Sequence, residues 1–197
     1  MSGVPFLVLR HGATAWNRTG RLQGRADIPL DAAGAAAIAG RRLPGRFAGY
    51  RWLTSPLVRA VETARLLGME AAPEPALIET DWGRWEGQTL VMLRAADPSV
   101  AVREAAGLDL AAPGGESPRA LQTRLVPLLA SVAAEGRPTG AVTHKGVIRA
   151  LLSLATGWDM TGPPPVRLDW SAAHLFVIDP AGRPVLERAN IALQETP

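Results

Sequence analysis

Two of the three histidines in this 197-residue chain stand at the end of a predicted strand, beside a cation. His11 follows Arg10 at the end of one apolar run, and His144 precedes Lys145 at the end of another. A neutral imidazole is a competent nucleophile near neutral pH, and its cationic form stabilises negative charge. Arginine side chains suit a dianionic phosphoryl group. These residues indicate phosphoryl chemistry, whereas a single histidine on an apolar strand is more often part of the core, so both alternatives stay open here.

Other sequence features narrow the kind of phosphate site. Gly12 and Gly146 follow the two strand ends and would let backbone approach a ligand closely. The chain has no Walker loop and no G-x-G-x-x-G after a strand, so neither a nucleoside-triphosphate site nor a dinucleotide site is indicated. The third histidine, His174, has no cationic neighbour, and we interpret it as structural.

The composition excludes several classes of function. Hydrophobic residues make up 47 % of the chain, which is enough for a full core. The absence of cysteine excludes disulfides, thiolate nucleophiles and zinc–cysteine sites. The net charge is only +3, and the pI of 10.4 is high because the scattered bases are arginines apart from Lys145, so no nucleic-acid partner is expected. With no signal-peptide pattern and no apolar run of about 18 residues, we expect a cytoplasmic location and no membrane partner.

The elements that must position the histidines alternate between strands and helices. We predict strands at 5–9, 50–55 and 140–144, helices at 29–43, 55–68, 117–136 and 145–157, and a hairpin at 172–190. Asp31 and Ser55 are the expected N-caps, Gly68 the expected helix end, and Pro127 a predicted kink.

This order predicts one α/β domain over residues 1–197, a three-layer α/β/α sandwich with a mostly parallel central sheet. A short cap insertion is expected at about 86–116, with a helical piece near 88–96. Ligands of such sheets bind outside the carboxyl ends of the strands. We therefore expect the two histidine strand ends to meet Arg59, which follows the strand 50–55.

Five sequence blocks in order carry a family resemblance. They read "LRHGATAWNRTGRLQGRADIPLDAAG", "TSPLVRAVETA", "LIETDWGRWEGQ", "PGGES" and "VTHKGVIRALL". Together they span most of residues 7–152 and resemble the signature of the histidine phosphatase superfamily, which has the phosphoglycerate-mutase-like fold, on its phosphatase branch.

The resemblance implies a role for each matching position around the phosphoryl group. His11 would be the nucleophile that forms a phosphohistidine, and Arg10 and Arg59 would clamp the phosphate oxygens. Asn17 would donate a hydrogen bond to the phosphate, and His144 would stabilise the developing charge. No metal ion and no cofactor are implied, because the arginines and histidines already supply positive charge.

A general acid is also implied. Glu79 would protonate the leaving oxygen and then activate water, with Asp81 and Glu86 as nearby alternatives. Further substrate contacts are expected from Thr14 and Gln23. Tryptophans near these blocks could stack on a substrate, although packing is the more common role; they are Trp16, Trp82 and Trp85.

One position departs from the family pattern. Lys145 stands where the resemblance predicts a second glycine after the histidine. It is either an exposed first-turn residue of a helix or an added cation of the phosphate pocket, and we include it in the predicted pocket.

The length and composition of the segment between Glu79 and Gly115 favour a phosphatase over a mutase. The part of the chain between Glu79 and Gly115 is short and contains only Arg84, Arg94 and Arg103 as bases, as expected for a cap over small phosphomonoesters. The alternatives are a cofactor-dependent phosphoglycerate mutase, an α-ribazole phosphatase as the specific assignment, and a non-catalytic phosphate-binding protein. The expected partner is a small phosphorylated substrate, and the sequence does not indicate an oligomeric state.

Overall fold

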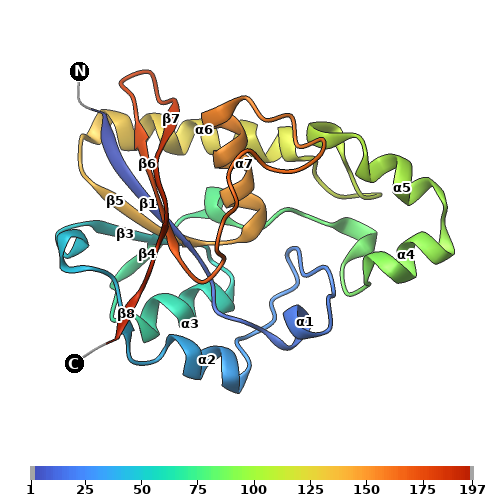
Figure 1. Cartoon of the computed structure of the whole chain (residues 1–197), viewed down its shortest axis with the longest axis horizontal. Coiled ribbons are helices and arrows are strands. Elements are labelled where there is room, and N and C mark those ends of the chain that lie inside the picture. The colour runs from blue at the N-terminus through green and yellow to red at the C-terminus, as the bar shows by residue number, and fades with distance from the viewer. Residues whose placement is uncertain (1–2, 196–197) are drawn as a thin grey trace.

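The computed structural model describes residues 3–195, which build one twisted six-stranded sheet with helices on both faces (Figure 1). The strand order is β4-β3-β5-β1-β6-β7. The strands are β1 (Val4–Arg10), β3 (Arg51–Thr54), β4 (Ala71–Pro73), β5 (Thr139–Thr143), β6 (Ala173–Ile178) and β7 (Pro184–Ile191). Only β6 runs against the others, because it pairs antiparallel with both β1 and β7. The predicted α/β fold with a mostly parallel central sheet is confirmed.

The central strand β1 is buried on both faces, and its side chains alternate between two hydrophobic clusters. Phe6 and Val8 pack with α6 (Pro118–Glu135) and α7 (Lys145–Thr156), whereas Leu7 and Leu9 pack against α3 (Val58–Leu66). A strand covered on both sides needs a continuous apolar sequence, which is what this run provides. The helices on the two faces make the layers of the predicted sandwich.

The predicted helix 29–43 is too long. Helix α2 covers Ala32–Ile38 and begins as expected at Asp31, whose carboxylate accepts a 2.6 Å hydrogen bond from the backbone of Gly34. The helix ends before Gly40, which adopts a left-handed φ of 75°. The next residues form strand β2 (Arg41–Arg42), which pairs with β8 (Gln194–Glu195) near the end of the chain. That partner lies at the far end of the sequence, so no local pattern indicates it.

The predicted helix 55–68 begins later than expected. Helix α3 starts at Val58, and Ser55 is not its N-cap. The backbone N–H of Val58 instead donates a 2.7 Å hydrogen bond to the carboxylate of Asp27. The predicted helix end is close, since α3 finishes at Leu66 just before Gly68 with its φ of 71°.

The later elements match their predictions more closely. Helix α6 starts after its cap Ser117 and continues through Pro127 to Glu135, and α7 follows β5 directly. The C-terminal hairpin β6–β7 turns at Asp179, whose carboxylate accepts hydrogen bonds from two backbone N–H groups of the turn. The edge strand β4 and several short helices were not predicted; the latter are α1 (Ala15–Arg18), η1 (Gly45–Phe47), η2 (Pro75–Leu77) and η3 (Gly83–Trp85).

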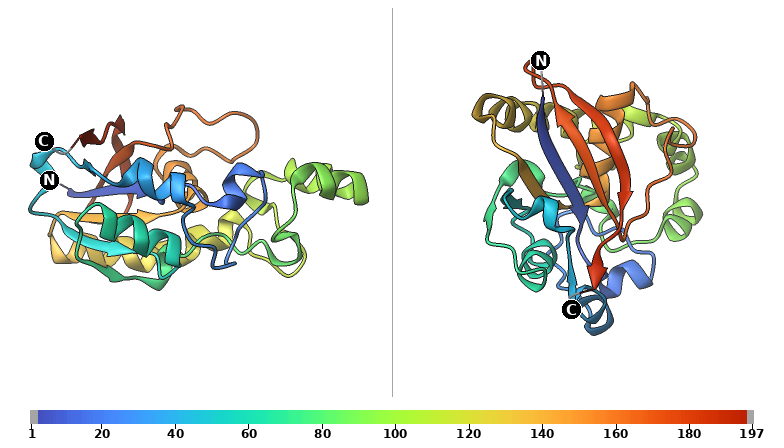
Figure 2. Two further views of the ribbon diagram at one scale, coloured as in Figure 1. Left: turned by 90° about the horizontal axis from the view of Figure 1, so that it is seen from below. Right: turned by 60° about the vertical axis from the view of Figure 1, so that its left-hand side comes forward.

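Residues 86–116 contain α4 (Leu90–Ala96), α5 (Ser99–Glu104) and η4 (Gly107–Asp109). The predicted helical piece corresponds to α4, whereas α5 was not predicted. Both helices project from the sheet on the side opposite the two termini (Figures 1 and 2). Their apolar side chains join Trp85 in a small hydrophobic cluster separate from the two clusters of the sheet. Within residues 3–195, no helix is long and apolar enough to cross a membrane.

Candidate active site

A pocket of about 610 Å³ lies beyond the carboxyl ends of the parallel strands. Backbone hydrogen bonds extend the sheet to this edge, because the N–H of His11 donates to Thr143 and that of Ser55 donates to Val142, both at 2.9 Å. Seven of the residues expected from the sequence line the pocket: Arg10, His11, Asn17, Gln23, Arg59, Glu79 and Lys145. The fold therefore brings together residues from widely separated sequence blocks.

The His11 ring is held in one tautomer. Its Nδ1 lies 2.6 Å from the carbonyl oxygen of Gly12, which can only accept a hydrogen bond, so Nδ1 carries the proton. Nε2 is then left with its lone pair. Burial, together with the positive charges of Arg10 and Arg59, lowers the His11 pKa to about 3. His11 is therefore a neutral imidazole over the whole physiological pH range.

His144 lies directly behind His11, with its ring centroid 5.1 Å away. It is fully buried and does not line the pocket itself. Its Nε2 is 2.7 Å from the hydroxyl of Ser55, and its Nδ1 is buried without a hydrogen-bond partner among the described residues. Burial, followed by the electrostatic effect of His11 and the positive charges of Arg59 and Arg10, lowers the His144 pKa well below its usual value.

Arg59 is fully buried and Arg10 is partly buried, and neither has a carboxylate within ion-pair distance in the described part of the chain. The Arg59 guanidinium donates 2.8 Å hydrogen bonds to the carbonyl groups of Gly24 and Ala26. Among the described residues, the Nε atoms of both arginines are buried and have no partner. Burial lowers the pKa of both side chains. Two desolvated cations without an ion-pair partner, although Glu79 attracts both from a longer distance, can hold an anion.

Glu86, one of the alternative acids, does not line the pocket but holds the loop that fixes Arg59. Its two carboxylate oxygens accept hydrogen bonds from the backbone of Arg25 at 2.6 Å and of Ala26 at 3.0 Å. The same loop presents the carbonyl groups that bind Arg59. Glu86 thus acts on the anion site through backbone.

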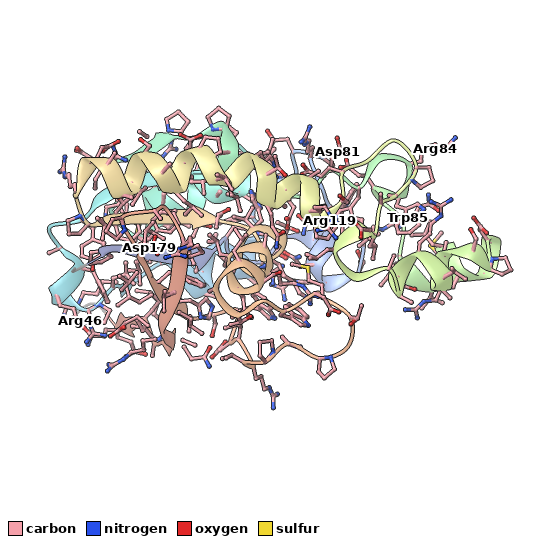
Figure 3. The ribbon with its side chains drawn as sticks, turned by 90° about the horizontal axis from the view of Figure 1, so that it is seen from above. Arg46, Asp81, Arg84, Trp85, Arg119 and Asp179 are labelled. Atoms are coloured by element: carbon pink, nitrogen blue, oxygen red, sulfur yellow. The ribbon has the colours of Figure 1, made fainter. Side chains whose placement is uncertain are left out.

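Asp81, the other alternative acid, is also outside the pocket lining. Its carboxylate accepts a 2.8 Å hydrogen bond from the backbone of Gly83 and lies 3.3 Å from the guanidinium of Arg25. These bonds give Asp81 a role in the loop that leads to Trp85. In Figure 3, Trp85 marks the end of the molecule that carries α4 and α5, opposite Arg46.

Glu79 is the only carboxylate of the three that faces the pocket, and it is 9 % exposed. Its Oε1 accepts hydrogen bonds from the backbone N–H groups of Thr80 at 2.8 Å and Gly146 at 3.1 Å. Arg124 of α6 donates hydrogen bonds to the carbonyl groups of Ala76, Ile78 and Glu79, which fixes the backbone of this segment.

Thr14 is placed differently from the expected substrate contact. It is fully buried and does not line the pocket. Its hydroxyl donates a 3.0 Å hydrogen bond to Gln23, and its backbone N–H donates a 3.0 Å hydrogen bond to the side-chain oxygen of Asn17. Thr14 therefore orients two pocket residues.

Of the three tryptophans that could stack on a substrate, Trp82 and Trp85 line the pocket and their rings stack at 6.2 Å, whereas Trp16 lies outside the lining. Trp82 and Trp85 also pack in the hydrophobic cluster of α4 and α5. Several pocket residues were not predicted, among them Arg21, Thr80, Leu110, Arg149 and Met160. A sequence signal did exist for Arg149, because it lies four residues after Lys145 and thus on the same helix face.

His174 lies in β6 and is fully buried, as expected for a structural residue. Its Nδ1 accepts a 3.2 Å hydrogen bond from the backbone of Asn190, and burial lowers its pKa to about 4. Among residues 3–195, no group of three or more histidine, aspartate or glutamate side chains is arranged to hold a metal ion.

The described residues form a mostly parallel α/β sheet that carries two histidines and two arginines without ion pairs at its carboxyl edge. This combination of fold and site is typical of proteins that bind phosphoryl groups. The chain belongs to the histidine phosphatase superfamily (branch 1), whose family model matches residues 6–192. The resemblance found in the sequence is thereby confirmed.

Individual relatives agree with this family. The bifunctional protein Rv2228c of Mycobacterium tuberculosis is 33 % identical over 172 residues, which cover 78 % of this chain and 45 % of that protein. A glucosyl-3-phosphoglycerate phosphatase of Mycolicibacterium vanbaalenii is 31 % identical over 172 residues, covering 77 % of this chain and 74 % of the relative. The crystal structure of TTHB049 from Thermus thermophilus superimposes with a TM-score of 0.68 at 32 % identity, covering 96 % of this chain and 100 % of the other.

The chain spans about half the length of some of these curated relatives.

Proposed function

We propose that this protein hydrolyses small phosphomonoesters through a phosphohistidine formed on His11. The observation that carries this proposal is the neutral His11 ring, with Nδ1 bonded to Gly12 and Nε2 unprotonated, beside two arginines without counterions in the described part of the chain. A nucleophile next to an anion site matches the needs of phosphoryl transfer.

In the first step, His11 Nε2 attacks the phosphorus atom while the bond from phosphorus to the leaving oxygen breaks. Arg10 and Arg59 hold the equatorial oxygens, and His144 supports the charge that develops on them. The carboxyl group of Glu79 gives its proton to the leaving oxygen, so the products are an alcohol, a Glu79 carboxylate and phosphohistidine.

In the second step, water attacks the phosphorus atom of the phosphohistidine. The Glu79 carboxylate takes a proton from this water, the phosphorus–nitrogen bond breaks, and inorganic phosphate leaves. His11 regains its lone pair and Glu79 its proton, so the cycle closes. Because the pocket cations supply the positive charge, we propose that no metal ion takes part.

A phosphatase is favoured over a phosphoglycerate mutase because relatives of this chain include a glucosyl-3-phosphoglycerate phosphatase and an acid phosphatase. The name glucosyl-3-phosphoglycerate phosphatase makes a small phosphorylated metabolite the first substrate to assay. α-Ribazole phosphate belongs in the same panel, and the expected cytoplasmic location stays a prediction.

The test is phosphate release from a panel of small phosphomonoesters, measured in EDTA for the intact protein and for His11→Ala. We expect release from the intact protein and none from the variant. Brief incubation with a ³²P-labelled ester should leave acid-labile, base-stable label on the intact protein. Release that persists in His11→Ala, or label that is stable to acid, would contradict the phosphohistidine route.

A further inference from the structure

The pocket carries more positive charge than one phosphoryl group needs. Arg10 and Arg59 flank His11, and Lys145 and Arg149 of α7 line the same pocket. In the described part of the chain, no carboxylate lies within ion-pair distance of Lys145 or Arg149.

Lys145 and Arg149 are four residues apart on α7, so their side chains share one helix face. The ammonium of Lys145 lies 5.2 Å from the ring centroid of Trp170, and the guanidinium of Arg149 lies 4.7 Å from that of Trp158. The ring faces attract these cations and restrict where they lie, but they do not neutralise the formal charges.

Neither of the two acidic residues that line the pocket forms an ion pair with Lys145 or Arg149. Glu104 lines the pocket but already forms a 2.7 Å ion pair with Arg94, and Glu79 is hydrogen-bonded to backbone N–H groups. Lys145 is exposed as a whole residue; partial burial, followed by the charges of Arg149 and Arg10, lowers its pKa, whereas the charge of Glu79 raises it. A bound anion would relieve this repulsion.

We propose that Lys145 and Arg149 form a second anion subsite, which binds a carboxylate or a second phosphoryl group of the substrate. Because an α-helix rises about 1.5 Å per residue, the Cα atoms of Lys145 and Arg149 are separated by about 6 Å along the helix axis. The subsite therefore starts beside the phosphate pocket and extends one turn away from it. The inference rests on the proposed function and narrows its substrates to phosphomonoesters with a second anionic group.

Two matched substrate pairs test this subsite. 3-Phosphoglycerate and glycerol 3-phosphate share a three-carbon skeleton and differ in a carboxylate against a hydroxymethyl group. Fructose 1,6-bisphosphate and fructose 6-phosphate differ in a second phosphoryl group. We expect kcat/KM to favour the more anionic member of at least one pair by about tenfold or more, and the preferred pair identifies the anion.

Variants assign that preference to the two cations. Lys145→Met and Arg149→Met remove the charge and keep an apolar stem for packing, and each should lower the preference about tenfold. Arg65→Met, which removes an exposed charge of α3 outside the pocket, is the control and should leave the preference unchanged. A preference near one in the intact protein, or one that survives in both variants, overturns the subsite.

Calorimetric binding to His11→Ala separates the subsite from the proposed function. We expect the more anionic member of the preferred pair to bind more tightly, and Lys145→Met or Arg149→Met in this background to abolish the difference. That binding pattern without hydrolysis by the intact protein would uphold the subsite and contradict the phosphatase. Hydrolysis without any charge preference would support the phosphatase and contradict the subsite. The absence of both binding and hydrolysis would contradict both proposals.

Discussion

Replacing Gly146 with alanine should selectively damage the acid step of catalysis. A Cβ atom at this position would lie 2.2 Å from Oε1 of Glu79 and 2.3 Å from the hydroxyl of Thr80. The Glu79 carboxylate must then retreat by about 1 Å to reach an ordinary van der Waals distance. That movement also breaks or lengthens the 3.1 Å hydrogen bond from the Gly146 N–H.

The expected loss of kcat/KM follows from this displacement of the Glu79 carboxylate. A misplacement of about 1 Å costs roughly 10²-fold in rate, and general acid catalysis contributes about 10²–10⁴-fold. Glycerol 3-phosphate needs its leaving oxygen protonated, whereas the p-nitrophenolate of p-nitrophenyl phosphate leaves readily as an anion. We expect kcat/KM of Gly146→Ala to fall about 10²-fold or more for the alkyl ester and only about tenfold for the aryl ester.

The assay compares both esters under the same conditions, with thermal unfolding as the check on folding. Overpacking should cost about 1–3 kcal/mol of stability. Gly49→Ala is the matched control, because this exposed glycine has no heavy atom within 4 Å of its added Cβ atom. Equal losses for the two esters, or an unchanged rate for the alkyl ester, would refute the assignment of Glu79 as the acid.

Three further predictions concern His11 and the groups around it. The His11 pKa of about 3 in the folded chain lies below the value of 6.5 in the unfolded chain. The contribution of the neutral His11 ring to the free energy of unfolding is therefore complete above pH 6.5 and is lost as the pH falls toward 3. His11→Ala should therefore flatten the slope of unfolding free energy against pH by up to about 1.4 kcal/mol per pH unit in phosphate-free urea titrations, and an unchanged slope would contradict the buried neutral ring. Ser55→Ala removes the 2.7 Å bond to His144 and should lower kcat about tenfold with little change in KM; a change confined to KM would show that the ring needs no such support. Glu86→Gln leaves one oxygen for two backbone donors and should weaken phosphate inhibition about tenfold by loosening the loop that holds Arg59, whereas an unchanged inhibition constant would separate that loop from the anion site.

Local chemistry made much of the fold predictable. The apolar run ending at Arg10 reads as a buried strand from its composition alone, and Asp31 caps its helix through a hydrogen bond to a residue three positions away. Glycines such as Gly68 end helices because they adopt positive φ without steric cost. Signals of this kind act over a few residues, so the sequence alone contains them.

The placement of the acid alternatives could not be predicted in the same way. Glu79, Asp81 and Glu86 are close together in the chain, and all three are carboxylates in one irregular segment. Long-range hydrogen bonds distinguish them. Glu86 accepts from backbone N–H groups of a loop about 60 residues earlier, and Glu79 accepts from the backbone at the start of α7, 67 residues later. Composition and periodicity contain no information about such partners.

By itself, the sequence determined the residue types of the site, the α/β order of the elements and the edge of the sheet where the histidines meet. Tertiary structure alone decided that Thr14 is buried and does not line the pocket, and that Ser55 supports His144 instead of capping a helix. The physical reason is that apolar strand patterns, turns and local caps such as Asp31 depend on neighbours in the chain. Desolvation and hydrogen-bond partners depend on segments that only folding brings together.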